Sequence, residues 1–258
     1  MTGEVTPQAS VDCVVIDGPV SESAPGARRM ISRQAVGIDA PRPGPTAARE
    51  TEHALMCIDI MGAVEPLTRV HLVQIFEKDG EDAPAERVLE GLRRAAGLDA
   101  RVICLPLTIA ETRHAAEIET ICDRAASAGA IIVAAWAPGV DHAIPASFRS
   151  VMGVERMKSQ GACRTVNWIE ERRTAGTPMS ASMGTAVIAG LAASHLSLTR
   201  SADLGEFAAS VRGFASRAAP TATLPEPGPA RASFDFPTLA RCIGSAYREY
   251  LSGMPAAS

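Results

Sequence analysis

Residues 101–135 read RVICLPLTIAETRHAAEIETICDRAASAGAIIVAA. Two short apolar runs stand at the ends of this stretch, RVICL at 101–105 and AIIVAA at 130–135, and both have the length and the β-branched content of buried strands. Between them, residues from about 111 to 128 carry apolar side chains at helical spacing, and Gly129 is a suitable stop. A strand, a helix and a second strand in this order predict two parallel strands joined by a right-handed crossover.

The same alternation extends toward the N-terminus. Two further strands are predicted, by VDCVVI at 11–16 and by RVHLVQIF at 69–76. A short helix is expected at 53–63, and a longer one at 83–96. The polar stretch 18–51 is rich in Pro, Gly, Ser and Arg, so we expect it to be loop.

Three more helices are expected after the last strand, at 183–196, about 203–217 and about 236–251. A Pro- and Ala-rich linker at 218–232 precedes the last of them, and residues 1–10 are expected to be flexible. The sequence contains no internal repeat. We therefore interpret all of 1–258 as one α/β domain built around a parallel sheet.

Composition excludes several classes of protein. A net charge of −4 argues against a general nucleic-acid binder, and an aromatic content of 4% argues against stacking platforms for single strands. No apolar run reaches the roughly 18 residues of a membrane span, so we expect no membrane partner. The N-terminus has no basic patch followed by an apolar stretch, which predicts no secretory signal and a cytoplasmic location.

Six cysteines are present, at Cys13, Cys57, Cys104, Cys122, Cys163 and Cys242. Their spacing contains no CxxC or other metal-like pairing, and several of them lie in apolar runs where a thiol acts as a small hydrophobe. We therefore expect reduced thiols, no metal site and no cofactor.

Three polar residues stand where ligands bind in open parallel sheets, beyond the carboxyl ends of strands and at helix starts. Asp17 ends the first strand and is followed by the turn residues Gly-Pro, His53 begins a helical segment, and Ser182 begins a helix of small residues. Each has an ordinary structural explanation by itself, as a turn aspartate, a polar helix start and an N-cap. Together, Asp, His and Ser in this order match one known chain order of a nucleophilic triad.

The motifs around these residues resemble those of the subtilisin-like (S8) serine proteases over most of the chain. VVIDGPV resembles the aspartate motif, in the form found in subtilases that mature cyanobactins and related peptides. EHALMCIDIMGAVEP resembles the histidine segment, RVHLVQIFEKDG the strand after it, and IPASFRSVMGV the PA-x4-V-x2-V segment. SASMGTAVIAGLAA resembles GTSMAxPxVAGxAA. A second register would place the nucleophile at Pro178, which is inert, so Ser182 is preferred.

The resemblance implies a three-layer fold, with a mainly parallel central sheet and helices on both faces. It also implies that Asp17 orients the imidazole, that His53 is the general base and then the acid, and that Ser182 attacks the scissile carbonyl. The residues that would bind substrate are those that occupy the family's substrate strand and oxyanion region, namely Cys104, Leu105, Pro106, Ala135, Trp136 and Pro138. Cys57 lies one helical turn after His53, so it is the cysteine to inspect first.

Some positions depart from the family pattern. The substrate strand reads CLPLTI where SLGG is usual, and Pro138 stands where the oxyanion asparagine is expected. Two hypotheses follow. The first is a cytoplasmic serine endopeptidase, slow for lack of that asparagine, which removes the leader of a ribosomally made precursor peptide. The alternative is a catalytically impaired subtilisin fold that binds a peptide or a protein. The sequence does not indicate an oligomeric state.

Overall fold

The computed structural model describes residues 10–20, 25–37, 52–77, 84–136, 142–155, 181–218 and 236–254. The strands are β1 (Val11–Asp17), β2 (Met30–Ala35), β3 (Thr68–Gln74), β4 (Val102–Leu105), β5 (Ile131–Trp136) and β6 (Val151–Glu155). The helices are a 3-10 turn η1 (Pro25–Arg29), α1 (Glu52–Val64), α2 (Ala85–Ala96), α3 (Ala115–Ser127), α5 (Ala181–Thr199), α6 (Leu204–Ala218) and α7 (Phe236–Ser252).

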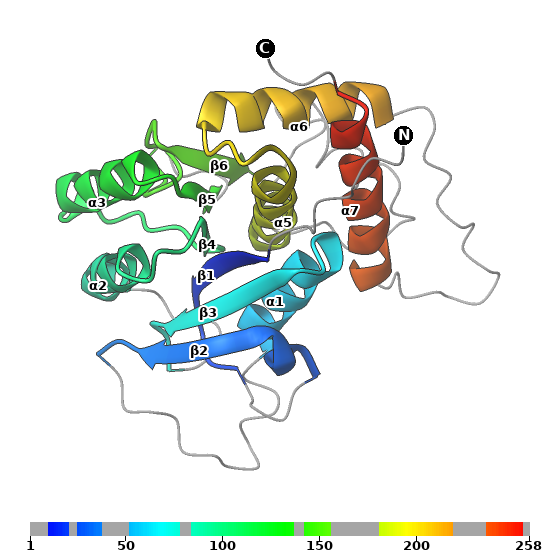
Figure 1. The fold of residues 1–258 in the computed structure, drawn as a ribbon. Coiled ribbons are helices and arrows are strands. Elements are labelled where there is room, and N and C mark those ends of the chain that lie inside the picture. Colours follow the sequence, from blue (N-terminus) through cyan, green and yellow to red (C-terminus); the bar gives the residue numbers. More distant parts are fainter. Residues whose placement is uncertain are drawn as a thin grey trace.

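The six strands form one parallel sheet in the order β2-β3-β1-β4-β5-β6. Figure 1 shows α2 and α3 on one side of the sheet, and α1, α5 and α7 on the other. The result is three layers, with the carboxyl ends of all strands at the same edge. The predicted three-layer α/β fold with a parallel sheet is confirmed.

The alternation of side chains along β1 decides which residues reach which layer. Cys13 and Val15 belong to the core under α1, α5 and α7, whereas Val14 and Ile16 belong to the core under α2 and α3. Successive side chains of a strand point to opposite faces, so Asp17 continues the first set. Its carboxylate is therefore directed toward the α1 layer.

The α1, α5 and α7 layer is packed closely at glycines. A Cβ added to Gly190 of α5 would lie 2.6 Å from the Cβ of Val64, and one added to Gly244 of α7 would lie 2.0 Å from the Val64 carbonyl oxygen. Real Cβ atoms essentially never approach other atoms so closely. Two helices can approach the end of α1 this closely only because neither has a side chain at the crossing.

A buried carboxylate connects the same three helices. Glu65 is 1% exposed, and its Oε2 accepts a hydrogen bond of 2.8 Å from the Ser194 hydroxyl of α5. The same oxygen lies 3.5 Å from Nη1 of Arg248 on α7, and Oε1 accepts a bond of 3.1 Å from the Leu67 amide. A buried charge needs such partners, because its desolvation costs several kcal/mol. Removing one partner of a buried pair typically lowers the stability of a protein by about 3–5 kcal/mol.

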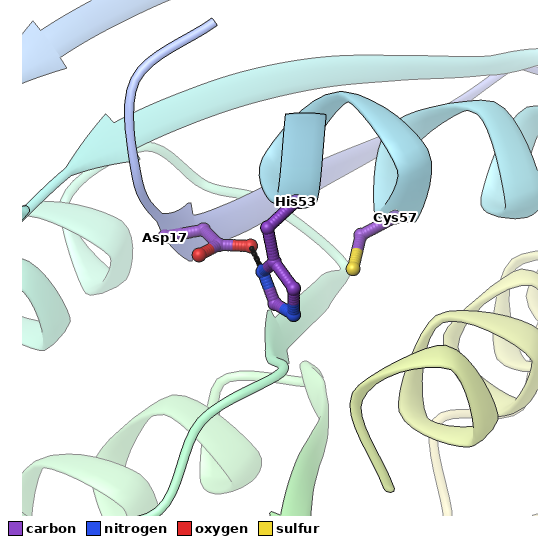
Figure 2. A group of neighbouring side chains, drawn as sticks. All are labelled: Asp17, His53 and Cys57. Carbon is purple, nitrogen blue, oxygen red and sulfur yellow. Dashed lines mark hydrogen bonds and ion pairs between the residues drawn. The ribbon is translucent and has the colours of Figure 1, made fainter. Parts of the chain in front are cut away.

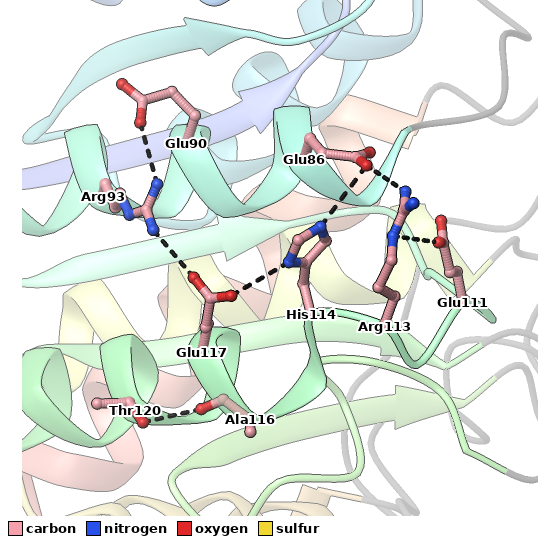
Figure 3. Close-up of polar contacts among 9 residues, drawn as sticks. All are labelled: Glu86, Glu90, Arg93, Glu111, Arg113, His114, Ala116, Glu117 and Thr120. Carbon is pink, nitrogen blue, oxygen red and sulfur yellow. Dashed lines mark hydrogen bonds and ion pairs between the residues drawn. The ribbon is translucent and has the colours of Figure 1, made fainter.

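On the opposite side of the sheet, α2 and α3 are joined at the surface by ion pairs (Figure 3). Glu117 of α3 accepts from Arg93 at 3.1 Å and pairs with His114 at 3.3 Å, while Glu86 of α2 pairs with Arg113 and His114. Most of these side chains are exposed, so each pair contributes little, about 0–1 kcal/mol. This network links the two surface helices on the face of the sheet opposite to α1, α5 and α7 (Figure 1).

α5 is the central helix of the fold. By length and composition alone its 19 residues are long and apolar enough to cross a membrane. However, 72% of its apolar window is buried within the protein, where it packs against α1, α7 and the strands. A core helix of this kind places its first residues against the sheet edge.

The structure corrects one expectation and adds one element. The stretch 18–51 was expected to be loop, but residues 25–35 form η1 and β2, and β2 pairs in parallel with β3. β2 lies at the edge of the sheet and is only half buried, so its sequence has no strong apolar pattern. The other edge strand, β6, was also not predicted as a strand. Pairing with an already formed sheet stabilises both. The proposed flexible N-terminus 1–10 and the linker 218–232 lie almost wholly outside the described residues.

Candidate active site

Asp17 is the last residue of β1 and its side chain is almost fully buried, with 2% of the residue exposed. Its two carboxylate oxygens have separate partners. Oδ1 accepts a 2.8 Å hydrogen bond from the backbone amide of Gly18, and Oδ2 lies 2.8 Å from Nδ1 of His53. Figure 2 shows this contact between the strand end and the first turn of α1. The structure thus brings together two of the three predicted catalytic side chains.

The contact determines how the imidazole of His53 is protonated. A carboxylate oxygen can only accept a hydrogen bond, so Nδ1 carries the ring proton and its N–H donates a hydrogen bond to Asp17. Nε2 of a neutral ring then keeps its lone pair, which is the arrangement a general base needs. The His53 side chain is 33% exposed, so solvent and ligands reach the ring while Asp17 beneath it stays dry.

Ser182 is the second residue of α5. Its hydroxyl donates a 2.8 Å hydrogen bond to the carbonyl oxygen of Pro106, directly after β4. β4 pairs with β1 with Cys104 opposite Val15, and two residues further along each strand come Pro106 and Asp17. The start of α5 therefore contacts the chain just after β4, the strand that lies next to β1 in the sheet.

The predicted substrate residues occupy the same edge of the sheet. Cys104 and Leu105 are fully buried on opposite faces of β4, so they support this edge from within the two cores. The carbonyl of Pro106 is engaged by Ser182, and that of Ala135 accepts from the Thr108 hydroxyl.

Trp136, the last residue of β5, is only partly buried. Its ring lies so close to Gly153 of β6 that a Cβ there would approach it to 3.2 Å. Pro138 lies outside the described residues.

A cysteine joins the Asp17–His53 pair. The ligand atoms of Asp17, His53 and Cys57 all lie within 4.8 Å of one another. Figure 2 shows the ring of His53 between the Asp17 carboxylate on one side and the Cys57 sulfur on the other. Cysteine spacing along the chain did not indicate this group, because Asp17 lies 36 residues before His53. The local signal was the position of Cys57 four residues after His53, on the same face of a helix.

The thiols of Cys13 and Cys104, in the same core, are unreactive. Burial, with the nearby charge of Asp17, raises the pKa of the Cys104 thiol well above its ordinary value. Burial likewise raises the pKa of the Cys13 thiol. Because the thiolate is the reactive form, these two cysteines act as apolar core residues, as their apolar surroundings predicted.

No protein-family model and no curated protein sequence matches the chain. Among solved structures it is similar to a variant of the protease domain of PatA, with a TM-score of 0.57 at 16% identity over 97% of this chain and 99% of the other. It is also similar to the prenylagaramide maturation protease PagA, with a TM-score of 0.56 at 15% identity over 95% and 94%. A lanthipeptide protease matches with a TM-score of 0.54 at 10% identity over 79% of each chain.

These matches cover nearly the full length of the PatA and PagA chains. The protein therefore has the α/β fold of the subtilisin-like maturation proteases, as the sequence motifs predicted. At identities this low the likeness establishes the fold, so the chemistry must be argued from the side chains of this chain.

Proposed function

We propose that this protein is a serine endopeptidase in which Asp17, His53 and Ser182 act as the triad. One observation carries the proposal: a buried Asp17, with one oxygen fixed by the Gly18 amide, holds Nδ1 of His53 at 2.8 Å at the sheet edge where α5 begins. In this fold ligands bind beyond the carboxyl ends of the strands. The subtilisin-like fold of the PatA and PagA proteases supports the same assignment.

The proposed chemistry is that of a nucleophilic triad. Nε2 of His53 removes the proton of the Ser182 hydroxyl as its oxygen attacks the scissile carbonyl, and the same nitrogen then protonates the leaving amine. Asp17 stabilises the imidazolium that forms between the two steps. Its burial strengthens this effect, because a charge pair is screened less away from water.

The oxyanion is stabilised by the start of α5. Free backbone amides and the positive end of the helix dipole favour negative charge at that point, next to Ser182. The usual second donor, an asparagine, is replaced in the sequence by Pro138. Loss of one such donor costs about 2.7–4 kcal/mol of transition-state stabilisation, or roughly 10²–10³ in rate. The proposed enzyme is therefore slow.

The proposed substrate is a ribosomally made precursor peptide whose leader is removed in the cytoplasm. Support comes from the structural neighbours, which are named as maturation proteases for patellamide and prenylagaramide. A slow enzyme suits this role, since one cut per precursor molecule is enough. The chain would need neither a metal nor a cofactor for the cleavage itself.

A second candidate is a peptide-binding module without turnover. It is favoured by the hydroxyl of Ser182, whose single proton is donated to the Pro106 carbonyl. A hydroxyl in this rotamer offers no proton to a base. Catalysis then requires the Ser182 side chain to rotate when substrate binds, whereas in a binding module the hydroxyl would stay on the Pro106 carbonyl.

Labelling with a fluorophosphonate probe separates the two. A peptidase labels in the wild type between about pH 6 and about pH 9, and labelling disappears in both Ser182→Ala and His53→Ala. If the folded wild type is not labelled at any pH in that range, the binding-module hypothesis replaces the peptidase. Labelling that survives in Ser182→Ala would show that another residue is the nucleophile.

A further inference from the structure

We propose that Asp17, His53 and Cys57 form a zinc site, and that zinc bound there switches the triad off. The switching part rests on the proposed function, whereas the binding part does not. The three ligand atoms lie within 4.8 Å of one another and come from β1 and from two positions one turn apart on α1. Among the described residues, this is where a carboxylate, an imidazole and a thiol meet.

The spacing is close to that of a bound zinc ion. Zinc bonds of about 2.0–2.3 Å in a tetrahedron separate neighbouring ligand atoms by about 3.3–3.6 Å. The observed separations are at most 4.8 Å, and the shortest, 2.8 Å between Asp17 Oδ2 and His53 Nδ1, is a hydrogen bond. The ion would replace that hydrogen bond, and the ligand atoms would move by about an ångström to complete the shell. Figure 2 shows Asp17 and Cys57 on two sides of the His53 ring, and the partial exposure of the His53 side chain lets water reach the group as a fourth ligand.

The donor set also selects the metal. Nitrogen, sulfur and one carboxylate oxygen suit zinc, whereas magnesium and calcium take oxygen ligands alone. Charge is balanced as well, because an Asp17 carboxylate and a Cys57 thiolate together neutralise a divalent cation in a buried site. Binding releases the proton of the Cys57 thiol, since zinc deprotonates a coordinating thiol outright.

Zinc in this position removes the general base. An ion shared with Asp17 binds Nδ1 of His53, the ring nitrogen that faces the carboxylate. The ring proton then moves to Nε2, which loses the lone pair that would accept the Ser182 proton. Asp17 no longer orients a basic imidazole, so the activated serine becomes inert.

Cobalt(II) is the probe for binding, because it occupies zinc sites and shows a thiolate charge-transfer band. We expect one equivalent of Co²⁺ to bind the wild type with this band, and one equivalent of Zn²⁺ to displace it. Cys57→Ala should abolish the band and weaken Zn²⁺ binding by about 100-fold or more. Cys57→Ser, which keeps the size of the side chain, provides a second variant if the alanine variant unfolds. The matched control is Cys122→Ala, a buried cysteine of α3 in the core on the other side of the sheet, which should bind Co²⁺ like the wild type.

The second readout is fluorophosphonate labelling of each variant with and without Zn²⁺, expressed as a ratio. Zinc should suppress labelling of the wild type and of Cys122→Ala, chelation should restore it, and the Cys57 variants should be insensitive. Labelling without a Co²⁺ band overturns the zinc site and leaves the peptidase standing. A band without labelling of the metal-free protein supports the zinc site and counts against the peptidase. A band that persists in the Cys57 variants overturns the assignment of the ligands.

Discussion

Asp17→Asn tests the arrangement of the proposed triad most directly. The Gly18 amide donates to one side-chain oxygen of Asp17 at 2.8 Å, so an asparagine keeps its single oxygen on that donor. Its amide nitrogen then takes the other position, 2.8 Å from Nδ1 of His53, and can only donate. The imidazole must accept at Nδ1 and carry its proton on Nε2, which leaves no lone pair facing a serine.

The expected loss is about 10⁴-fold in rate, which corresponds to about 5 kcal/mol of transition-state stabilisation. The measurement is the second-order rate constant for fluorophosphonate labelling of Ser182, together with thermal unfolding to show that the variant is folded. The fold should change little, because the substitution keeps the size of a buried side chain and both of its contacts.

Asp12→Asn is the matched control. Asp12 lies on the same strand and pairs with Arg69 at 2.6 Å on the surface, at the end remote from the site. Its labelling rate should equal that of the wild type. A folded Asp17→Asn that labels within about tenfold of the wild type would refute the reasoning, because the tautomer of His53 would then not control the serine.

Three further predictions concern the framework of the site. Glu65→Ala removes the buried acceptor shared by α5 and α7 and should lower the free energy of unfolding by about 3–5 kcal/mol in urea titrations. Gly244→Ala places a Cβ 2.0 Å from a backbone oxygen and should lower the free energy of unfolding by about 3 kcal/mol. In the control Gly97→Ala the added Cβ would lie 3.5 Å from its nearest atom, so its stability should be close to that of the wild type. Equal melting temperatures of the two variants would count against the close α1–α7 contact. Burial lowers the pKa of His195, so below about pH 6.5 the unfolded chain takes up a proton that the folded protein does not. The free energy of unfolding therefore decreases as the pH is lowered through this range. Glu206 opposes this shift, and His195→Gln should flatten the dependence measured by thermal melts from about pH 7 to about pH 5.

Much of the fold is predictable because its signals are local. The buried strands β1, β4 and β5 are unbroken apolar runs, and α2 and α3 show helical spacing and stop signals within their own residues. The edge strands β2 and β6 have a neighbouring strand on one side only and are partly exposed, so they lack an unbroken apolar run. Their strand conformation depends on hydrogen bonds to neighbours that the local sequence does not specify.

The sequence by itself determined the parallel α/β architecture and placed Asp17, His53 and Ser182 at the ends of elements, because strand ends, turns and helix starts are encoded within a few residues. The tertiary structure decided which of these side chains meet. The 2.8 Å contact between Asp17 and His53 depends on the parity of β1 and on the packing of α1 across the sheet edge. The approach of Cys57 to the same pair and the burial of Glu65 between three helices have the same origin. These contacts join residues that are distant along the chain, so only the packed layers bring them within bonding distance.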